Sequence, residues 1–183
     1  DTLKCLPYTG TFDGKGHSIR NLNIDQGDTK RNAGLFCELK GATIQNLVIE
    51  DTCYFKGNIA GALSPLLSES GSVTFRNIKN HAKVQGTQYG GGLIGLFLGV
   101  KSSTVLFQNC ENTRSIVGKT NGGFIGFVLV AKDTSFEFVE CKNDCSVVGG
   151  LYGTGGFIGN VSNSETITIR VQRSANSGQV VGR

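Results

Sequence analysis

Few side chains in this sequence are of the types that carry out acid–base or metal chemistry. The two histidines are His17 and His81, and neither stands in an H-E-x-x-H zinc motif. Carboxylates gather early in the chain, at Asp13, Asp25, Asp28, Glu50 and Asp51. Polysaccharide cleavage needs such groups together on one face, but these fall in separate turn-like segments, which predicts different faces. We therefore expect a protein that is not an enzyme, with no catalytic residue, no bound metal and no cofactor.

Two tyrosines and one asparagine are candidate contacts for sugars. Tyr89 and Tyr152 each lie three residues after a glycine, in what we expect to be loops, and together they would form a ligand platform for a glycan. The alternative is that both tyrosines are merely exposed at turns. Asn160 begins the sequon Asn160-Val161-Ser162, which predicts N-glycosylation in a secreted eukaryotic protein.

Cysteine is the remaining residue type with reactive chemistry. The chain contains six, at Cys5, Cys37, Cys53, Cys110, Cys141 and Cys145. No pair has the C-x-x-C spacing of a zinc site. An even number of cysteines favours an oxidising, extracellular compartment.

All of these side chains are positioned by an internal repeat. Four segments of fourteen residues align without a gap and end in glycine, at 73–86, 105–118, 136–149 and 169–182. A second phrase, Gly-Gly followed by an apolar residue, Ile and Gly, recurs at 91–95, 122–126 and 155–159. Successive segments begin 32, 31 and 33 residues apart. Two motifs that recur together at one period indicate a repeat architecture.

Each repeat contains short runs of β-branched and aromatic residues bounded by Gly, Asn, Asp, Ser or Thr. The runs are too short for helices and lack the i, i+3, i+4, i+7 spacing of an amphipathic helix. Three short strands per repeat predict an all-β parallel β-helix, or β-solenoid, of about six rungs of about 31 residues each. We expect one domain over residues 1–183, with rungs at about 8–33, 34–60, 61–91, 92–122, 123–155 and 156–183.

Stacking of rungs ~4.8 Å apart would place equivalent residues in columns. Asn80, Asn112, Asn143 and Asn176 share one column, which predicts a structural ladder of amide side chains. Cys110 and Cys141 share another column. A Cα separation of ~5 Å there permits either a disulfide or a ladder of reduced, buried thiols.

These motifs resemble the GLUG repeat, named for a glycine-rich Gly-Leu-any-Gly core. The resemblance rests on the Gly-Gly phrases, the Asn-Cys-x-Asn segment at 109–112 and the opening residues 8–22, which resemble the phrase that precedes such repeats. It implies a secreted or surface-attached protein, often adhesin-like, whose repeats build a solenoid stalk or binding surface. Two departures stand out: Glu140 replaces the asparagine before Cys141, and Ser174 replaces the cysteine of the last repeat.

Composition narrows the range of partners. The net charge is +4, but the 18 Lys and Arg residues are scattered without aromatic interleaving, so we expect no nucleic-acid binding. No apolar run approaches the ~18 residues of a membrane span, so we expect no membrane insertion. The chain contains no Met, and both of its ends fall within predicted rungs. We expect the exposed strand edges to stack on flanking repeats or on other copies of the chain, head to tail.

The sequence as a whole predicts an extracellular or cell-surface module that builds a stalk, adhesin or filament. The alternative function is a β-helix that binds or cleaves glycans, and surface glycans are then the expected partner.

Overall fold

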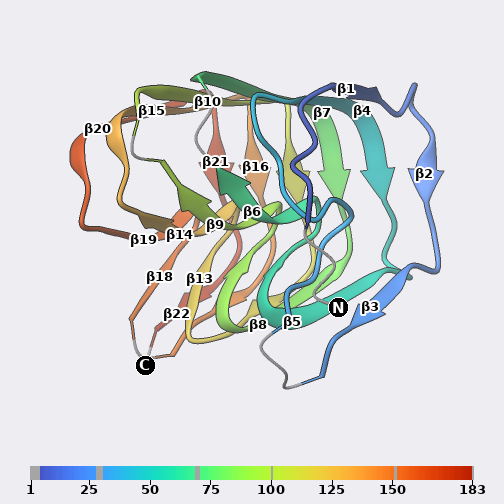
Figure 1. Cartoon of the computed structure of the whole chain (residues 1–183). Coiled ribbons are helices and arrows are strands. Elements are labelled where there is room, and N and C mark those ends of the chain that lie inside the picture. The colour runs from blue at the N-terminus through green and yellow to red at the C-terminus, as the bar shows by residue number, and fades with distance from the viewer. Residues whose placement is uncertain (1–4, 28–30, 69–70, 100, 151, 183) are drawn as a thin grey trace.

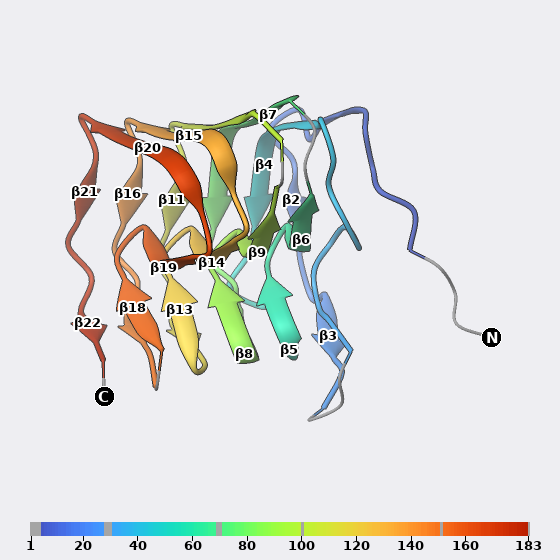
Figure 2. The same cartoon turned by 60° about the vertical axis from the view of Figure 1, so that its left-hand side comes forward.

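The chain winds as a parallel β-solenoid around one continuous core (Figure 1). The computed structural model describes residues 5–27, 31–68, 71–99, 101–150 and 152–182. Strands line three faces, and successive turns of the chain stack from the first rung to the last (Figure 2). Figure 2 shows this order plainly, with the blue N-terminal strands at one end of the stack and the red C-terminal strands at the other.

The first face carries the longest strand and the largest number of strands. Its members are β1 (Thr11–Asp13), β2 (Ser18–Ile19), β4 (Thr43–Ile49), β7 (Gly71–Asn80), β10 (Ser103–Gln108), β11 (Glu111–Asn112), β15 (Lys132–Val139), β16 (Lys142–Asn143), β20 (Glu165–Gln172) and β21 (Ala175–Asn176). Strands β1, β4, β7, β10, β15 and β20 pair in this order, so the described chain makes about five turns between the first of them and the last.

The other two faces complete each rung. The second face contains β3 (Asn23–Asp25), β5 (Tyr54–Gly61), β8 (Lys83–Gly91), β12 (Ile116–Val117), β13 (Thr120–Gly122), β17 (Val147–Val148), β18 (Gly153–Gly155) and β22 (Val180–Val181). The third contains β6 (Ser64–Ser68), β9 (Ile94–Leu98), β14 (Ile125–Leu129) and β19 (Ile158–Ser162). The predicted all-β parallel solenoid is therefore confirmed, although β7 and β8 are longer than the short runs that the sequence indicated.

The register of the first face reproduces the period of the sequence repeat. Val73 pairs with Val105, Val105 with Phe136, and Phe136 with Ile169. These partners are 32, 31 and 33 residues apart, as the aligned segments are. The sequence columns are consequently the columns of the structure.

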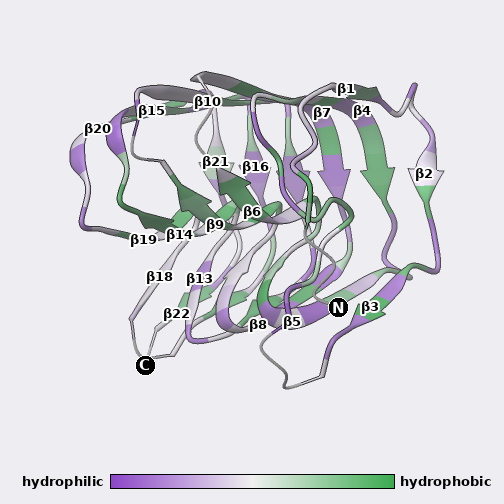
Figure 3. Cartoon of the chain, in the orientation of Figure 1, coloured by the Kyte–Doolittle hydropathy of each residue, from purple (hydrophilic) through white to green (hydrophobic). Residues whose placement is uncertain are grey.

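The core is filled by side chains that alternate inward along the strands, as the pleat requires. In β10, Ser103, Val105 and Phe107 are buried, and the residues between them face outward. Phe107 stacks between Phe75 and Phe138, with ring centroids 4.8 Å and 5.0 Å apart. In Figure 3 the third-face strands β9 and β14 are largely green, which agrees with the burial of their Ile, Leu, Phe and Val side chains.

A disulfide ties the first rung to the second. It joins Cys5 to Cys37, whose Cα atoms are 6.1 Å apart and which are separated by 32 residues, one repeat period. The remaining cysteines, Cys53, Cys110, Cys141 and Cys145, are free and buried.

Candidate functional site

The amide column predicted from the sequence lies at a corner of the core. Asn80, Asn112, Asn143 and Asn176 are register partners, and the first three are buried. Asn80 Nδ2 donates to Asn112 Oδ1 at 3.1 Å, and Asn143 Nδ2 donates to Asn176 Oδ1 at 2.6 Å. The ladder is therefore built of direct amide contacts within two pairs of rungs.

The same asparagines also hold the Gly-Gly phrases in place. Asn80 Nδ2 donates to the carbonyl of Gly92 at 2.8 Å, and Asn112 Nδ2 donates to the carbonyl of Gly123 at 2.6 Å. A Cβ added at Gly92 would lie 2.7 Å from Asn112 Oδ1, and one added at Gly123 would lie 2.6 Å from Asn143 Cγ. Any larger residue would displace the amide, so the two recurrent motifs are one physical unit.

A second asparagine ladder runs along the outside of the solenoid, and the sequence analysis did not identify it as one. Asn109 donates to Asn77 and Asn77 to Asn46, each at 2.8 Å, and Asn46 donates to the Asp13 carboxylate at 2.9 Å. Asn46, Asn77 and Asn109 have φ between 51° and 55°, a left-handed conformation that asparagine tolerates better than other residues with a side chain. The signal in the sequence was the asparagine recurring at the same position of each early repeat.

Asp13 ends this outer ladder, and its bonding explains its titration. Its carboxylate accepts hydrogen bonds from Asn46, from the backbone N–H of Lys15 and from Gln45. These bonds, the one from Asn46 foremost, favour the ionised form and lower the pKa of Asp13. The carboxylate thus already has structural partners.

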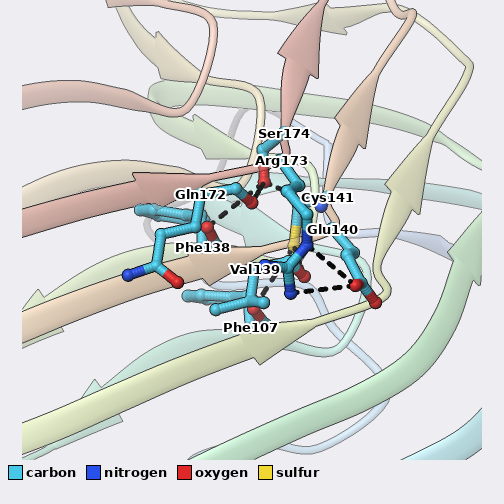
Figure 4. A network of polar contacts seen from close by, with 8 residues as sticks. All are labelled: Phe107, Phe138, Val139, Glu140, Cys141, Gln172, Arg173 and Ser174. Atoms are coloured by element: carbon cyan, nitrogen blue, oxygen red, sulfur yellow. Dashed lines mark hydrogen bonds and ion pairs between the residues drawn. The ribbon is translucent and has the colours of Figure 1, made fainter.

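In the last two rungs an ion pair replaces the outer amides. Glu140 and Arg173 continue the left-handed column, with φ of 56° and 48°, and Arg173 approaches Glu140 Oε1 at 3.0 Å (Figure 4). The departure from the Asn-Cys pattern before Cys141 therefore replaces an Asn–Asn hydrogen bond between rungs with a Glu–Arg ion pair.

The cysteine column is a row of hydrogen-bond donors to the preceding rung. Cys110 Sγ donates to the carbonyl of Phe75 at 3.5 Å, and Cys141 Sγ donates to that of Phe107 at 3.3 Å. Ser174 Oγ makes the equivalent bond to Phe138 at 3.2 Å, which Figure 4 shows beside Cys141. Because a hydroxyl makes the same contact as the thiol, serine fits the last position of the column. Burial raises the pKa of Cys110 well above its usual value, so this thiol stays protonated.

The early carboxylates do not form one cluster. Asp25 lies on the second face, 4.0 Å from Lys56 Nζ, while Asp13 caps the outer ladder. Asp28 lies outside the described residues. His17, in the turn after β1, also lies apart from the others, and its backbone N–H donates to the carbonyl of Gly14.

Glu50 and Asp51 share an open surface depression of about 440 Å³ with His81, Thr113 and Arg114. His81 Nδ1 is 2.7 Å from Thr113 Oγ1, and Glu50 is 3.9 Å from the guanidinium of Arg20. Carboxylates and an imidazole therefore meet on one face here, but both Glu50 and His81 already take part in contacts along the solenoid. No group of three or more His, Cys, Asp or Glu placed to hold a metal occurs in the described ranges.

The two candidate tyrosines line a second depression, of about 270 Å³, together with Gln88 and Lys119. Tyr89, Thr120 and Gly153 are register partners, so Gln88, Lys119 and Tyr152, which directly precede them, lie on three successive rungs. Tyr89 lies in strand β8 and not in a loop as the sequence predicted, because its backbone pairs with Ile59 and Thr120. Its ring stacks on Phe127, with ring centroids 4.7 Å apart. Tyr152 precedes β18 and is 63% exposed.

Backbone bonds and Asn160 position Tyr152. The carbonyl of Lys119 accepts from the backbone N–H of Gly150 at 3.1 Å and from that of Tyr152 at 3.5 Å. Asn160 Nδ2 donates to the carbonyl of Tyr152. The asparagine of the predicted sequon therefore supports the tyrosine groove, which we define as Gln88, Tyr89, Lys119 and Tyr152.

Comparison with known proteins gives one partial match. The chain is 36% identical to Halomucin of Haloquadratum walsbyi over 89 residues, which is 48% of this chain and 1% of Halomucin. No family model and no solved structure matches the chain. In the part of the chain that the structure describes, no helix is able to cross a lipid bilayer.

Proposed function

We propose that this chain is a non-enzymatic structural or adhesive module of an extracellular or cell-surface protein, built from repeats of the GLUG type. The observation that carries the proposal is the unbroken register of the first face from β1 to β20. It makes the solenoid a stiff element that can be lengthened by adding rungs. The Cys5–Cys37 disulfide and the partial similarity to a protein named Halomucin support an extracellular location.

The last rung supports stacking as the mode of assembly. Ile169, Val171 and Val180 are 48%, 48% and 40% exposed, whereas their register partners one rung earlier, Phe136, Phe138 and Val147, are fully buried. Since a further rung in the same register would cover these side chains and pair the open backbone edge, we propose a flanking repeat or a second copy as the partner.

Small-angle scattering and negative-stain microscopy of the purified chain would test this proposal. We expect a rod, and we expect its length to grow with concentration if second copies stack at the open edge. Val171→Lys places a charge at the edge and should abolish growth, whereas Thr168→Lys on the same strand, facing outward, should leave it intact. Equal growth of both variants would exclude stacking through this edge, and a globular particle would contradict the module itself.

Surface labelling of intact cells would test the proposed extracellular location separately. Labelling of intact source cells with a membrane-impermeant, lysine-directed reagent should modify the chain. Labelling only after lysis would contradict the extracellular assignment.

Glycan binding is a second candidate function, and the tyrosine groove favours it. Cleavage of polysaccharides would have to use the Glu50, Asp51 and His81 depression. We propose that it does not occur, because Glu50 and His81 are engaged in contacts along the solenoid. A screen for new reducing ends should find none. Release that is lost in His81→Ala would overturn this assignment.

A further inference from the structure

The tyrosine groove offers hydrogen-bond donors and is lined by no negatively charged side chain. Lys119 offers three N–H donors and a full positive charge, and its side chain is exposed. No carboxylate in the described ranges pairs with it, and none lines the groove. Gln88 accepts from Asn58 Nδ2 at 3.5 Å through its carbonyl oxygen, which orients its amide. An unpaired cation beside an amide in a concavity is complementary to an anion.

The ring of Tyr89 and the backbone of Tyr152 are held before any ligand arrives. Tyr89 is held from below by Phe127, with an angle of 18° between the rings. The backbone of Tyr152 is anchored to Lys119 and to Asn160, so the residue from which its exposed ring projects is fixed beside the cation. Preorganised aromatic surfaces favour binding because little side-chain entropy is lost on contact.

The size and direction of the groove limit what fits. Its volume of about 270 Å³ lies just below the ~300–1,000 Å³ typical of pockets for drug-sized ligands, so it accepts one small ring at a time. Gln88, Lys119 and Tyr152 follow one another along the solenoid axis at the rung spacing of ~4.8 Å, a length comparable to that of one pyranose unit. A polymer of such rings, lying along the axis, would meet all three residues in succession.

We propose that the groove binds an acidic polysaccharide, with the apolar face of a carboxylated sugar ring on Tyr152 and its carboxylate on Lys119. This inference rests on the glycan-binding candidate function and adds to it the charge of the ligand and the residue that selects for it. Tyr89 lines the groove beside this ring, and Gln88 donates to a ring or hydroxyl oxygen of the neighbouring unit.

A matched pair of ligands tests the assignment on the full chain. Polygalacturonate and its fully methyl-esterified form share one backbone and differ in charge, so their affinities isolate the contribution of the carboxylate. In calorimetric titrations at about 0.15 M salt we expect the acidic polymer to bind about tenfold more tightly than the ester. Equal binding of the two polymers, or binding of neither, would overturn the proposal.

Variants separate the two contacts. Lys119→Gln should reduce the affinity for polygalacturonate to that for the ester, and Lys119→Arg should retain the preference. Tyr152→Ala should weaken binding of both polymers by about tenfold or more. Lys79→Gln, an equal loss of charge at an exposed site on the first face, is the control and should change neither affinity.

Simple attraction between a basic protein and a polyanion is the competing explanation, since the chain carries a net charge of +4. Polyglutamate that binds as tightly as polygalacturonate, or a Lys79→Gln effect as large as that of Lys119→Gln, would establish it and refute the sugar site. Because the scattering and microscopy experiments do not involve the groove, a negative result here leaves the structural role intact.

Discussion

Replacement of Asn112 by leucine tests whether the inner amide ladder stabilises the solenoid. The side chain is fully buried and has two partners, the carbonyl of Gly123 at 2.6 Å and the Nδ2 group of Asn80 at 3.1 Å. Leucine has a similar size but can neither donate nor accept, so both partners lose a hydrogen bond while the space stays filled.

The two losses differ in size. The carbonyl of Gly123 is left without its side-chain donor in a dry corner, at a cost of about 1–3 kcal/mol. Asn80 keeps a second acceptor, the carbonyl of Gly92 at 2.8 Å, so its loss costs only about 0.5–1 kcal/mol. Together they predict a destabilisation of about 1.5–4 kcal/mol. For a domain of this size that corresponds to a fall in Tm of about 3–16 °C.

Thermal and urea unfolding followed by circular dichroism would measure the change. Gln108→Leu is the control, because it makes the same change from amide to leucine on the outward side of β10 and should shift the unfolding free energy by less than about 0.5 kcal/mol. If the two variants have the same midpoint, the buried amide contributes nothing specific and the reasoning fails.

Three further predictions follow from the contacts between rungs. Gly123→Ala should lower the unfolding free energy by at least about 3 kcal/mol, because its Cβ would lie 1.9 Å from the carbonyl oxygen of Gly156. Gly150→Ala is the control and should be close to neutral, because the nearest atom to its Cβ would be 3.4 Å away. Similar unfolding midpoints of the two variants would contradict this prediction. Cys141→Ser should retain the Tm of the parent and Cys141→Val should lower it, because only serine preserves the hydrogen bond to the Phe107 carbonyl. A valine variant as stable as the parent would show that the column requires only a side chain of this size and no hydrogen bond. Hydrogen bonds from Asn46, Lys15 and Gln45 hold the folded pKa of Asp13 below the ordinary value of an aspartate, so its contribution to stability is present above that ordinary value and is lost as the pH falls through the folded value. Asp13→Asn should therefore be less stable than the parent at pH 7 and should show a flatter decline in Tm on acidification, and parallel curves would refute this.

The fold could be predicted because the repeat itself records the register. Once the fourteen-residue segments were aligned, the period and the columns of Asn112 and Cys110 followed from stacking alone. The Cys5–Cys37 disulfide was within reach by the same argument, since the two residues are one period apart. The sequence did not predict this pair, because the first rung lacks the aligned motifs from which the period is read.

The candidate site was harder to predict, because it depends on contacts between faces that the repeat does not encode. The sequence pointed to Tyr89 and Tyr152 but placed Tyr89 in a loop, since nothing in the local pattern shows that Phe127 packs beneath it. Nothing in the sequence distinguishes Lys119 from the other scattered residues among the 18 Lys and Arg. Only the register of Thr120 with Tyr89 and Gly153 places it between the two tyrosines.

Between Val73 and Ile169 the differences in repeat length arise at one corner of the solenoid. Gln85 and Tyr89 are four residues apart, their register partners Val117 and Thr120 are three apart, and Val148 and Gly153 are five apart. The distance from each Gly-Gly phrase to the next aligned segment is constant, so the register of the asparagine and phenylalanine columns in these repeats is unchanged. This corner carries the tyrosine groove. It is thus a point at which the last repeats gain or lose residues without disturbing the stack. Selection can diversify recognition there, and an engineer can graft a foreign peptide there onto the rod.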